Sequence, residues 1–264
     1  MDRRFFGSQG LILPLVFLVL GTLASALMAY GTHPGWAQYA HGIDLILWSR
    51  RLQWPCIAFT LVMCVALLVM IVSGRRRAWW LIGLGPILAL FAHKFHIQAG
   101  TQLDVTDAPA LVSAAQADLL ADDTYVVGLV FEDQAYAFPY PVLFTTPGVI
   151  VQNRDKKMML IWSPDANRAV AARVDLDVKA RDLEVVSTPA NSVLLYNSRL
   201  GQFIVGVTGK TDRGEMPDGF RAPLQVYKTT WAAWRAPRSI RSTILHVSAP
   251  RRARLSASIR IARR

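Results

Sequence analysis

The chain has 264 residues and a formal net charge of +11. The charge is unevenly distributed along the chain. Residues 1–96 contain eight Lys or Arg and two acidic residues, and residues 97–231 contain twelve Lys or Arg and sixteen acidic residues. Residues 232–264 contain nine arginines and no acidic residue. The acidic balance of the central part excludes a nucleic-acid-binding domain there, and its lack of cysteine excludes thiol chemistry and Cys-ligated metal.

Three apolar runs occupy the first third of the chain. Residues 11–30 and 55–72 contain no charged residue, and a shorter run begins at Ala78. About 20 apolar residues are needed for a helix to cross a bilayer. We therefore expect three transmembrane helices, at about 11–30, 55–73 and 78–95, in a membrane region covering residues 1–96. Alternatively, Ala24-Ser25-Ala26 is a signal-peptide cleavage site, which leaves two spans.

The segment 42–54 combines apolar residues at helical spacing with aromatic and basic ones, which is typical of an interfacial helix; a simple loop is the alternative. The residues expected at the membrane interface, there and after the second run, are Trp48, Arg50, Arg51, Trp54, Arg75, Arg76 and Arg77.

The basic residues also predict the orientation. Arg3 and Arg4 precede the first run, and three arginines follow the second. Because cytoplasmic loops are enriched in Lys and Arg, we expect a cytoplasmic N-terminus in the inner membrane and a soluble domain on the periplasmic side. The expected partners are the lipid bilayer and other membrane-protein subunits, with no nucleic acid.

Four histidines flank the apolar runs, but they come from separate segments without a carboxylate partner: His33, His41, His93 and His96. We predict no metal site and no cofactor.

Residues 97–117 are expected to form a linker and a short helix, the latter spanning about Ala110 to Leu120. Residues 118–236 then contain short runs rich in Val, Ile, Leu and aromatic residues, separated by turn signals, which predict a β-rich, mainly antiparallel domain. These runs are 124–131, 134–140, 148–152, 157–162, 169–174, 183–187, 192–197 and 202–207. Residues 229–235 predict a helical turn. The expected fold class is a membrane-anchored α+β protein.

Catalytic signatures are absent from the sequence of this domain. It contains no glycine-rich phosphate loop, no Gly-x-Ser-x-Gly and no histidine between residues 97 and 245. A serine nucleophile needs a base, and carboxylate pairs such as Asp175/Asp177 are typical of solvated turns.

Four segments, in order, resemble the bacterial family known as domain of unknown function 3179. They are TYVVGLVFEDQAYAFPY, LIWSPDANRAVAARV, LLYNSRLGQFIVGVTGKT and TTWAAWR, within residues 118–236. Typical members carry Tyr-Cys-Pro-Leu where this chain has Trp162-Ser163-Pro164-Asp165. They also carry a Trp-His pair where this chain has approximately Thr145-Thr146-Pro147. The resemblance implies a shared scaffold that lacks the soft ligands of the family.

We therefore expect a non-catalytic, membrane-anchored accessory or binding subunit. The alternative is an altered enzyme or ligand site around the turn 163–167. Its candidate ligand-binding residues are Ser163, Asp165, Asn167, Tyr196 and Asn197.

Residues 237–264 form an Arg-rich tail, with Pro237 and Pro250 flanking its first apolar positions. It is expected to be disordered and to adhere to the membrane surface; alternatively, it results from a reading-frame change and adds no packed structure. Either way, truncation after Pro237 is expected to leave the melting temperature within about 2 °C.

Overall fold

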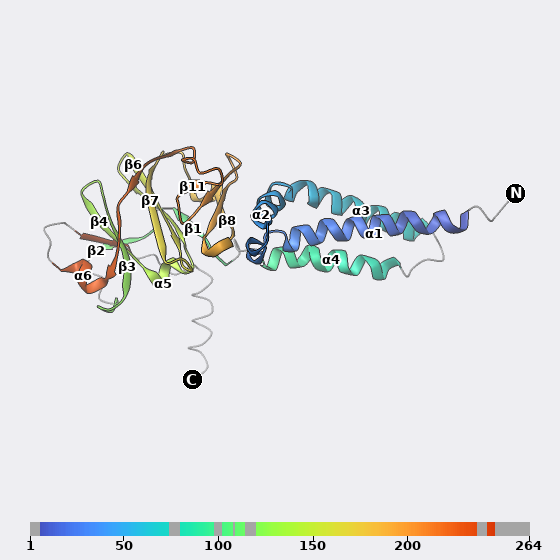
Figure 1. Ribbon diagram of the computed structural model, residues 1–264, viewed down its shortest axis with the longest axis horizontal. Coiled ribbons are helices and arrows are strands. Elements are labelled where there is room, and N and C mark those ends of the chain that lie inside the picture. Colours follow the sequence, from blue (N-terminus) through green and yellow to red (C-terminus); the bar gives the residue numbers. More distant parts are fainter. Residues whose placement is uncertain are drawn as a thin grey trace, which may run out of the picture. The chain divides into compact units, whose positions relative to one another are not determined.

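The computed structural model describes residues 6–73, 80–97, 102–107, 109–113, 120–236 and 242–245 (Figure 1). The chain divides into two compact units. The helical unit comprises Met1–Thr101 together with Val186–Ala190, and the β-rich unit comprises Gln102–Val185 and Asn191–Arg264.

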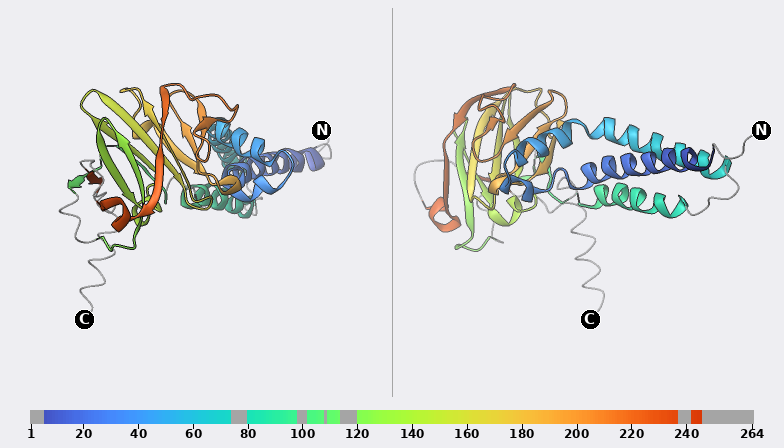
Figure 2. Two further views of the ribbon diagram at one scale, coloured as in Figure 1. Left: turned by 60° about the vertical axis from the view of Figure 1, so that its left-hand side comes forward. Right: turned by 45° about the vertical axis from the view of Figure 1, so that its right-hand side comes forward.

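Three long helices lie side by side in the helical unit, as all views show (Figures 1 and 2). They are α1 (Phe6–Tyr30), α3 (Gln53–Ser73) and α4 (Trp80–Ile97). Their shared core contains Cys64, Leu67, Leu84 and Ile87, with Phe17 and Leu18 packed against it. The helices approach closely at Gly21 of α1, where a Cβ atom would lie 3.0 Å from Ile87 Cδ1.

A compact connection joins α1 to α3. It contains a 3-10 helix, η1 (Pro34–Gln38), and the helix α2 (Gly42–Arg51). The Trp36 indole donates a hydrogen bond to the Tyr30 carbonyl over 2.6 Å. A Cβ atom at Gly42 would lie 1.6 Å from the Trp36 carbonyl oxygen, so only glycine fits where α2 begins.

The expectation of three transmembrane helices is wrong for the part of the chain that the structure describes. There, no single helix is both long and apolar enough to cross a membrane. Pro14–Tyr30 and Leu84–Lys94 are the parts of α1 and α4 that meet the apolar criterion among the described residues. Both are shorter than the roughly 20 residues that a membrane span requires. Gly42–Arg51 and Gln53–Val69 meet the criteria of length and composition only as a pair, which is bent by 66°.

Three sheets build the β-rich unit. The first has the order β1-β5-β6-β7-β12, with β1 (Val105–Asp107), β5 (Gly148–Asn153), β6 (Lys156–Ser163), β7 (Arg168–Val174) and β12 (Phe220–Leu224). The second has the order β13-β3-β4-β14-β2, with β13 (Val226–Thr230), β3 (Tyr125–Phe131), β4 (Gln134–Pro139), β14 (Ser242–Leu245) and β2 (Leu111–Ser113). The third has the order β11-β10-β9-β8, with β11 (Lys210–Thr211), β10 (Gln202–Val205), β9 (Leu194–Asn197) and β8 (Leu183–Ser187).

Short helices connect these strands. They are α5 (Tyr140–Leu143), η4 (Ala180–Asp182), η5 (Pro189–Asn191) and α6 (Trp231–Arg235). Most strand pairs are antiparallel, whereas β1 pairs with β5, and β14 with β4, in parallel.

The main core lies between the first and second sheets. Alternate residues of five strands bury their side chains there, as the two-residue period of a strand requires. They are Val127, Leu129 and Phe131 on β3, Tyr136 and Phe138 on β4, Val149 and Val151 on β5, Met158, Leu160 and Trp162 on β6, and Ala169 and Ala171 on β7.

The opposite face of β6 is buried as well. A Cβ atom at Gly206, just after β10, would lie 2.8 Å from Ser163 Oγ and 3.2 Å from Ile161 Cγ2. The third sheet region therefore packs on this face, which explains why residues 157–163 are all buried.

The β-rich domain is confirmed, and each of the eight predicted runs contains a strand, β3 to β10. The predicted turn at 229–235 forms α6. The predicted helix at Ala110–Leu120 is wrong in its described part, because residues 111–113 form β2. The expectation that the Arg-rich tail is disordered is wrong for residues 242–245, which form β14 between β4 and β2. The other residues of 237–264 lie outside the described residues.

Candidate functional site

The predicted site at the turn after Trp162 is a hairpin between β6 and β7. Ser163 faces Arg168 in the register, so Pro164 to Asn167 form the loop. The Asn167 N–H donates to the Pro164 carbonyl over 2.9 Å, and Asn167 has a positive φ of 44°. Asn is one of the residues that adopts this conformation most readily. Proline and asparagine therefore shape the turn.

The Ser163 hydroxyl is used inside the protein. Ser163 is fully buried, and its Oγ accepts a hydrogen bond from the Val193 N–H over 3.0 Å. Because Gly206 lies against the same oxygen, no space remains for a substrate atom beside it. The hydroxyl links the first sheet to the segment that precedes β9.

Asn167 and Asp165 lie on the surface side of the same turn. The Tyr140 hydroxyl donates to Asn167 Oδ1 over 2.8 Å, and Lys228 Nζ donates to the Asn167 carbonyl over 2.7 Å. Burial raises the pKa of Tyr140, with a smaller contribution from Tyr125. Tyr140 is therefore a neutral donor that fastens the turn to α5.

The structure does not bring all the predicted ligand residues into one site. The Tyr196 ring packs on Phe203, with ring centroids 4.9 Å apart. Asn197 belongs to the turn between β9 and β10, where its Oδ1 accepts hydrogen bonds from the N–H groups of Arg199 and Leu200. Of the five predicted residues, Asn197 alone lines the cavity described next.

A polar cleft of about 130 Å³ lies beside Asn197. It is formed by the segment between β7 and η4, by the β9–β10 turn and by the residues before β12. Its lining consists of Asp175, Asp177, Val178, Lys179, Asp182, Asn197, Arg199, Leu200, Asp218 and Gly219.

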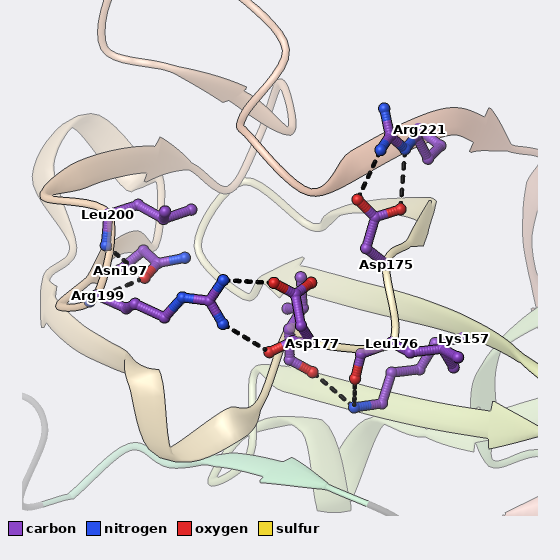
Figure 3. A network of polar contacts seen from close by, with 9 residues as sticks. Lys157, Asp175, Leu176, Asp177, Asn197, Arg199, Leu200 and Arg221 are labelled. Carbon is purple, nitrogen blue, oxygen red and sulfur yellow. Dashed lines mark hydrogen bonds and ion pairs between the residues drawn. The ribbon is translucent and has the colours of Figure 1, made fainter.

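Arginines neutralise two of the four carboxylates of the cleft (Figure 3). Arg221 binds Asp175 with two hydrogen bonds of 2.9 and 2.7 Å, and Arg199 binds Asp177. The hydrogen bond from Arg199 lowers the pKa of Asp177, so this carboxylate is ionised at neutral pH.

Lys157 binds the backbone of the segment that lines the cleft between β7 and η4. Its side chain is buried, and its Nζ donates to the Val178 carbonyl over 2.6 Å and to the Leu176 carbonyl over 3.4 Å (Figure 3). Its ammonium group also lies 3.8 Å from Asp107 Oδ1. A buried charge with these partners fixes the backbone that presents Asp177 and Lys179.

The cleft lacks the ligand set of a metal centre. Among the described residues, no group of three or more His, Cys, Asp or Glu side chains is arranged to hold a metal ion. The sequence singled out Asp175 and Asp177 as a carboxylate pair but assigned them to a solvated turn. Their position opposite Asn197 depends on the pairing of distant strands, for which the sequence carries no signal.

The predicted interface residues belong to the helical unit. Trp48 and Trp54 are strongly exposed, at 57% and 71%, and Arg51 is exposed, whereas Arg50 is buried. The predicted interfacial helix 42–54 corresponds to α2 and the start of α3. Arg75, Arg76 and Arg77 lie outside the described residues.

Comparisons with protein-family models, curated proteins and solved structures found no match. The resemblance to the 3179 family therefore stays a prediction.

Proposed function

We propose that this protein is a non-catalytic accessory or binding subunit whose helical unit contacts the acyl chains of a lipid bilayer. The observation that carries the proposal is the large number of apolar side chains on the outside of this unit, together with buried hydroxyl groups inside it.

Polar and small side chains occupy some interior positions of the helices, beside the apolar core residues Leu67, Leu84 and Ile87. Ser25 of α1 and Thr60 of α3 are buried, and neither hydroxyl has a hydrogen-bond partner within the described residues. Gly21 lies at the close contact between helices. Small and hydroxyl-bearing residues between helices are typical of packing in lipid, where apolar side chains gain nothing by turning inward.

Large apolar side chains cover the outside of the same helices. The exposed ones include Ile12, Leu15, Val19 and Leu23 on α1, Leu61, Val62, Val65, Leu68, Val69 and Val72 on α3, and Leu88 on α4. In water, each such side chain forgoes roughly 1.5–3 kcal/mol of burial free energy. An apolar surface of this extent requires a cover.

Lipid fits this surface better than one protein partner does. At 100° per residue, the exposed positions of α3 cover roughly half of its circumference, and α1 and α4 expose apolar residues too. A single partner helix covers a narrower stripe. The exposed aromatic residues Trp36, Tyr39, Trp48 and Trp54 gather around η1 and α2, where they suit the headgroup region.

The occupied Ser163 hydroxyl supports the non-catalytic part of the proposal, because a nucleophile must be open to a substrate and near a base. The periplasmic placement of the β-rich unit stays a prediction.

Vesicle flotation of the full chain tests the proposal. We expect the detergent-free protein to float with phosphatidylcholine vesicles, because acyl chains cover the outside of the helical unit. Replacing Leu61 and Val65 together by Lys should lower the bound fraction at least about fivefold, since a charge in the acyl region costs several kcal/mol.

The matched control is the double variant Leu176→Lys/Met216→Lys, which charges two exposed apolar residues of the β-rich unit. It should float like the unmodified chain. A protein that stays monomeric in buffer without floating, or a Leu61/Val65 variant that floats normally, would refute the proposal. Binding that needs anionic lipid and disappears in high salt would also refute it, because the contact would then be electrostatic.

A further inference from the structure

We infer that the polar cleft beside Asn197 binds a small zwitterion, of the size and charge pattern of a short α-amino acid. This inference concerns the β-rich unit and is independent of the lipid contact proposed above.

Asn197 supplies the observation that points to a ligand. Its side chain lines the cleft although the residue is only 5% exposed. Its Oδ1 accepts from two backbone N–H groups, at 3.1 Å from Arg199 and 3.2 Å from Leu200, and these donors fix the orientation of the amide. The Nδ2 group, which Figure 3 shows on the other side of the amide, has no hydrogen-bond partner among the described residues. The Nδ2 atom is not among the buried atoms that lack a partner, so solvent reaches it from the cleft and it can donate to an incoming acceptor.

A cation accompanies this donor. Lys179 lines the same cleft and, within the described part of the chain, is in no ion pair. The amide donor and the ammonium group together suit a carboxylate, which accepts hydrogen bonds at both oxygens.

Two carboxylates of the cleft are only weakly compensated. Asp218 Oδ2 accepts from the neutral amide of Gln202 over 2.7 Å, and Asp182 lies 3.7 Å from the Arg181 guanidinium. Both line the cleft. Asp175 and Asp177, by contrast, are already paired with arginines. The less compensated pair is suited to an ammonium group.

Size and charge together define the ligand class. A volume of about 130 Å³ is below the roughly 300–1,000 Å³ of a typical ligand pocket, so the cleft suits a ligand of few heavy atoms. Because weakly compensated groups of both signs line the cleft, a ligand with one charge leaves the other sign unmatched. We expect weak binding, with a Kd on the order of 1 mM, because such a cleft buries little of its ligand.

Saturation-transfer NMR on the full chain tests this inference with L-alanine as the probe. Propionate and ethylammonium are the matched controls, since each retains one charged half of alanine. With each compound at about 10 mM, we expect saturation transfer to L-alanine. Propionate and ethylammonium should each show at most about a tenth of that effect.

Variants locate the binding. Asn197→Asp keeps acceptors for Arg199 and Leu200 but replaces the free donor by a negative charge, and it should weaken binding at least about tenfold. Asp218→Asn, on the exposed rim, should have a similar effect and covers the case in which Asn197→Asp does not fold. Asp165→Asn and Lys210→Met are exposed changes outside the cleft lining and should leave binding unchanged.

Several results would overturn the inference: no transfer to L-alanine, equal transfer to either half, or unchanged alanine binding in a folded Asn197→Asp or Asp218→Asn variant. None of them affects the flotation result, so the two proposals fail separately.

Discussion

Ser163 lies at the end of β6, before the turn at which the sequence placed a candidate ligand site. Here its hydroxyl is completely buried and accepts the Val193 N–H. The backbone donor would otherwise be unsatisfied, so the hydroxyl stabilises the contact between β6 and the segment before β9. Its role is structural.

Ser163→Ala should therefore destabilise the β-rich unit by about 1–3 kcal/mol, because the Val193 N–H loses its acceptor in a buried place. Asp165→Ala, in the exposed part of the same turn, should change stability by less than about 0.5 kcal/mol. Denaturant unfolding of the full chain, followed by tryptophan fluorescence, measures both. Equal stability of the Ser163 variant and the unmodified chain would show that this hydrogen bond contributes nothing.

The sequence allowed part of this residue-level picture to be predicted. The lack of a nearby histidine argued against a Ser163 nucleophile, and Pro164 and Asn167 indicated a turn. The partner of Ser163, however, lies thirty residues further along the chain. Only the tertiary packing brings these two residues together.

At the scale of elements, length and composition decided which strands were predictable. The eight confirmed runs, which correspond to β3 to β10, are rich in Val, Ile and aromatic residues. Most of the strands missed in the described part of the chain are short or unusual: β1 and β2 have three residues each, β11 has two, β14 has four, and β12 contains Pro223. β13, with five residues, was missed without such a reason. Their conformation comes from pairing with a neighbouring strand, which outweighs a weak local preference.

β14 changes the expectation for the tail. It pairs in parallel with β4 and antiparallel with β2, so it lies inside the second sheet. Truncation after Pro237 should therefore lower the melting temperature by more than about 2 °C, because β4 loses a ladder neighbour. Truncation after Leu245 is the control and should cause a smaller change. Identical thermal unfolding of both truncated chains would mean that β14 contributes no stability.

At the scale of the whole molecule, the two units differ in the side chains that they expose. The β-rich unit buries alternate large apolar side chains between sheets, as a protein in water does. The helical unit buries Ser25 and Thr60 beside Leu67, Leu84 and Ile87, and it exposes leucines and valines on its outside. Composition alone revealed the apolar first third, but it could not reveal which faces of the helices point inward.

Photolabelling with a phospholipid that carries a diazirine on its acyl chain tests the lipid contact most directly, since it needs no substitution in the protein. After irradiation of the full chain in vesicles, mass spectrometry should locate adducts on α1, α3 and α4, at outward positions such as Leu23, Leu61 and Val65. Peptides from β6 and β7 should carry none. Adducts confined to the β-rich unit, or their absence from all three helices of vesicle-bound protein, would contradict the account.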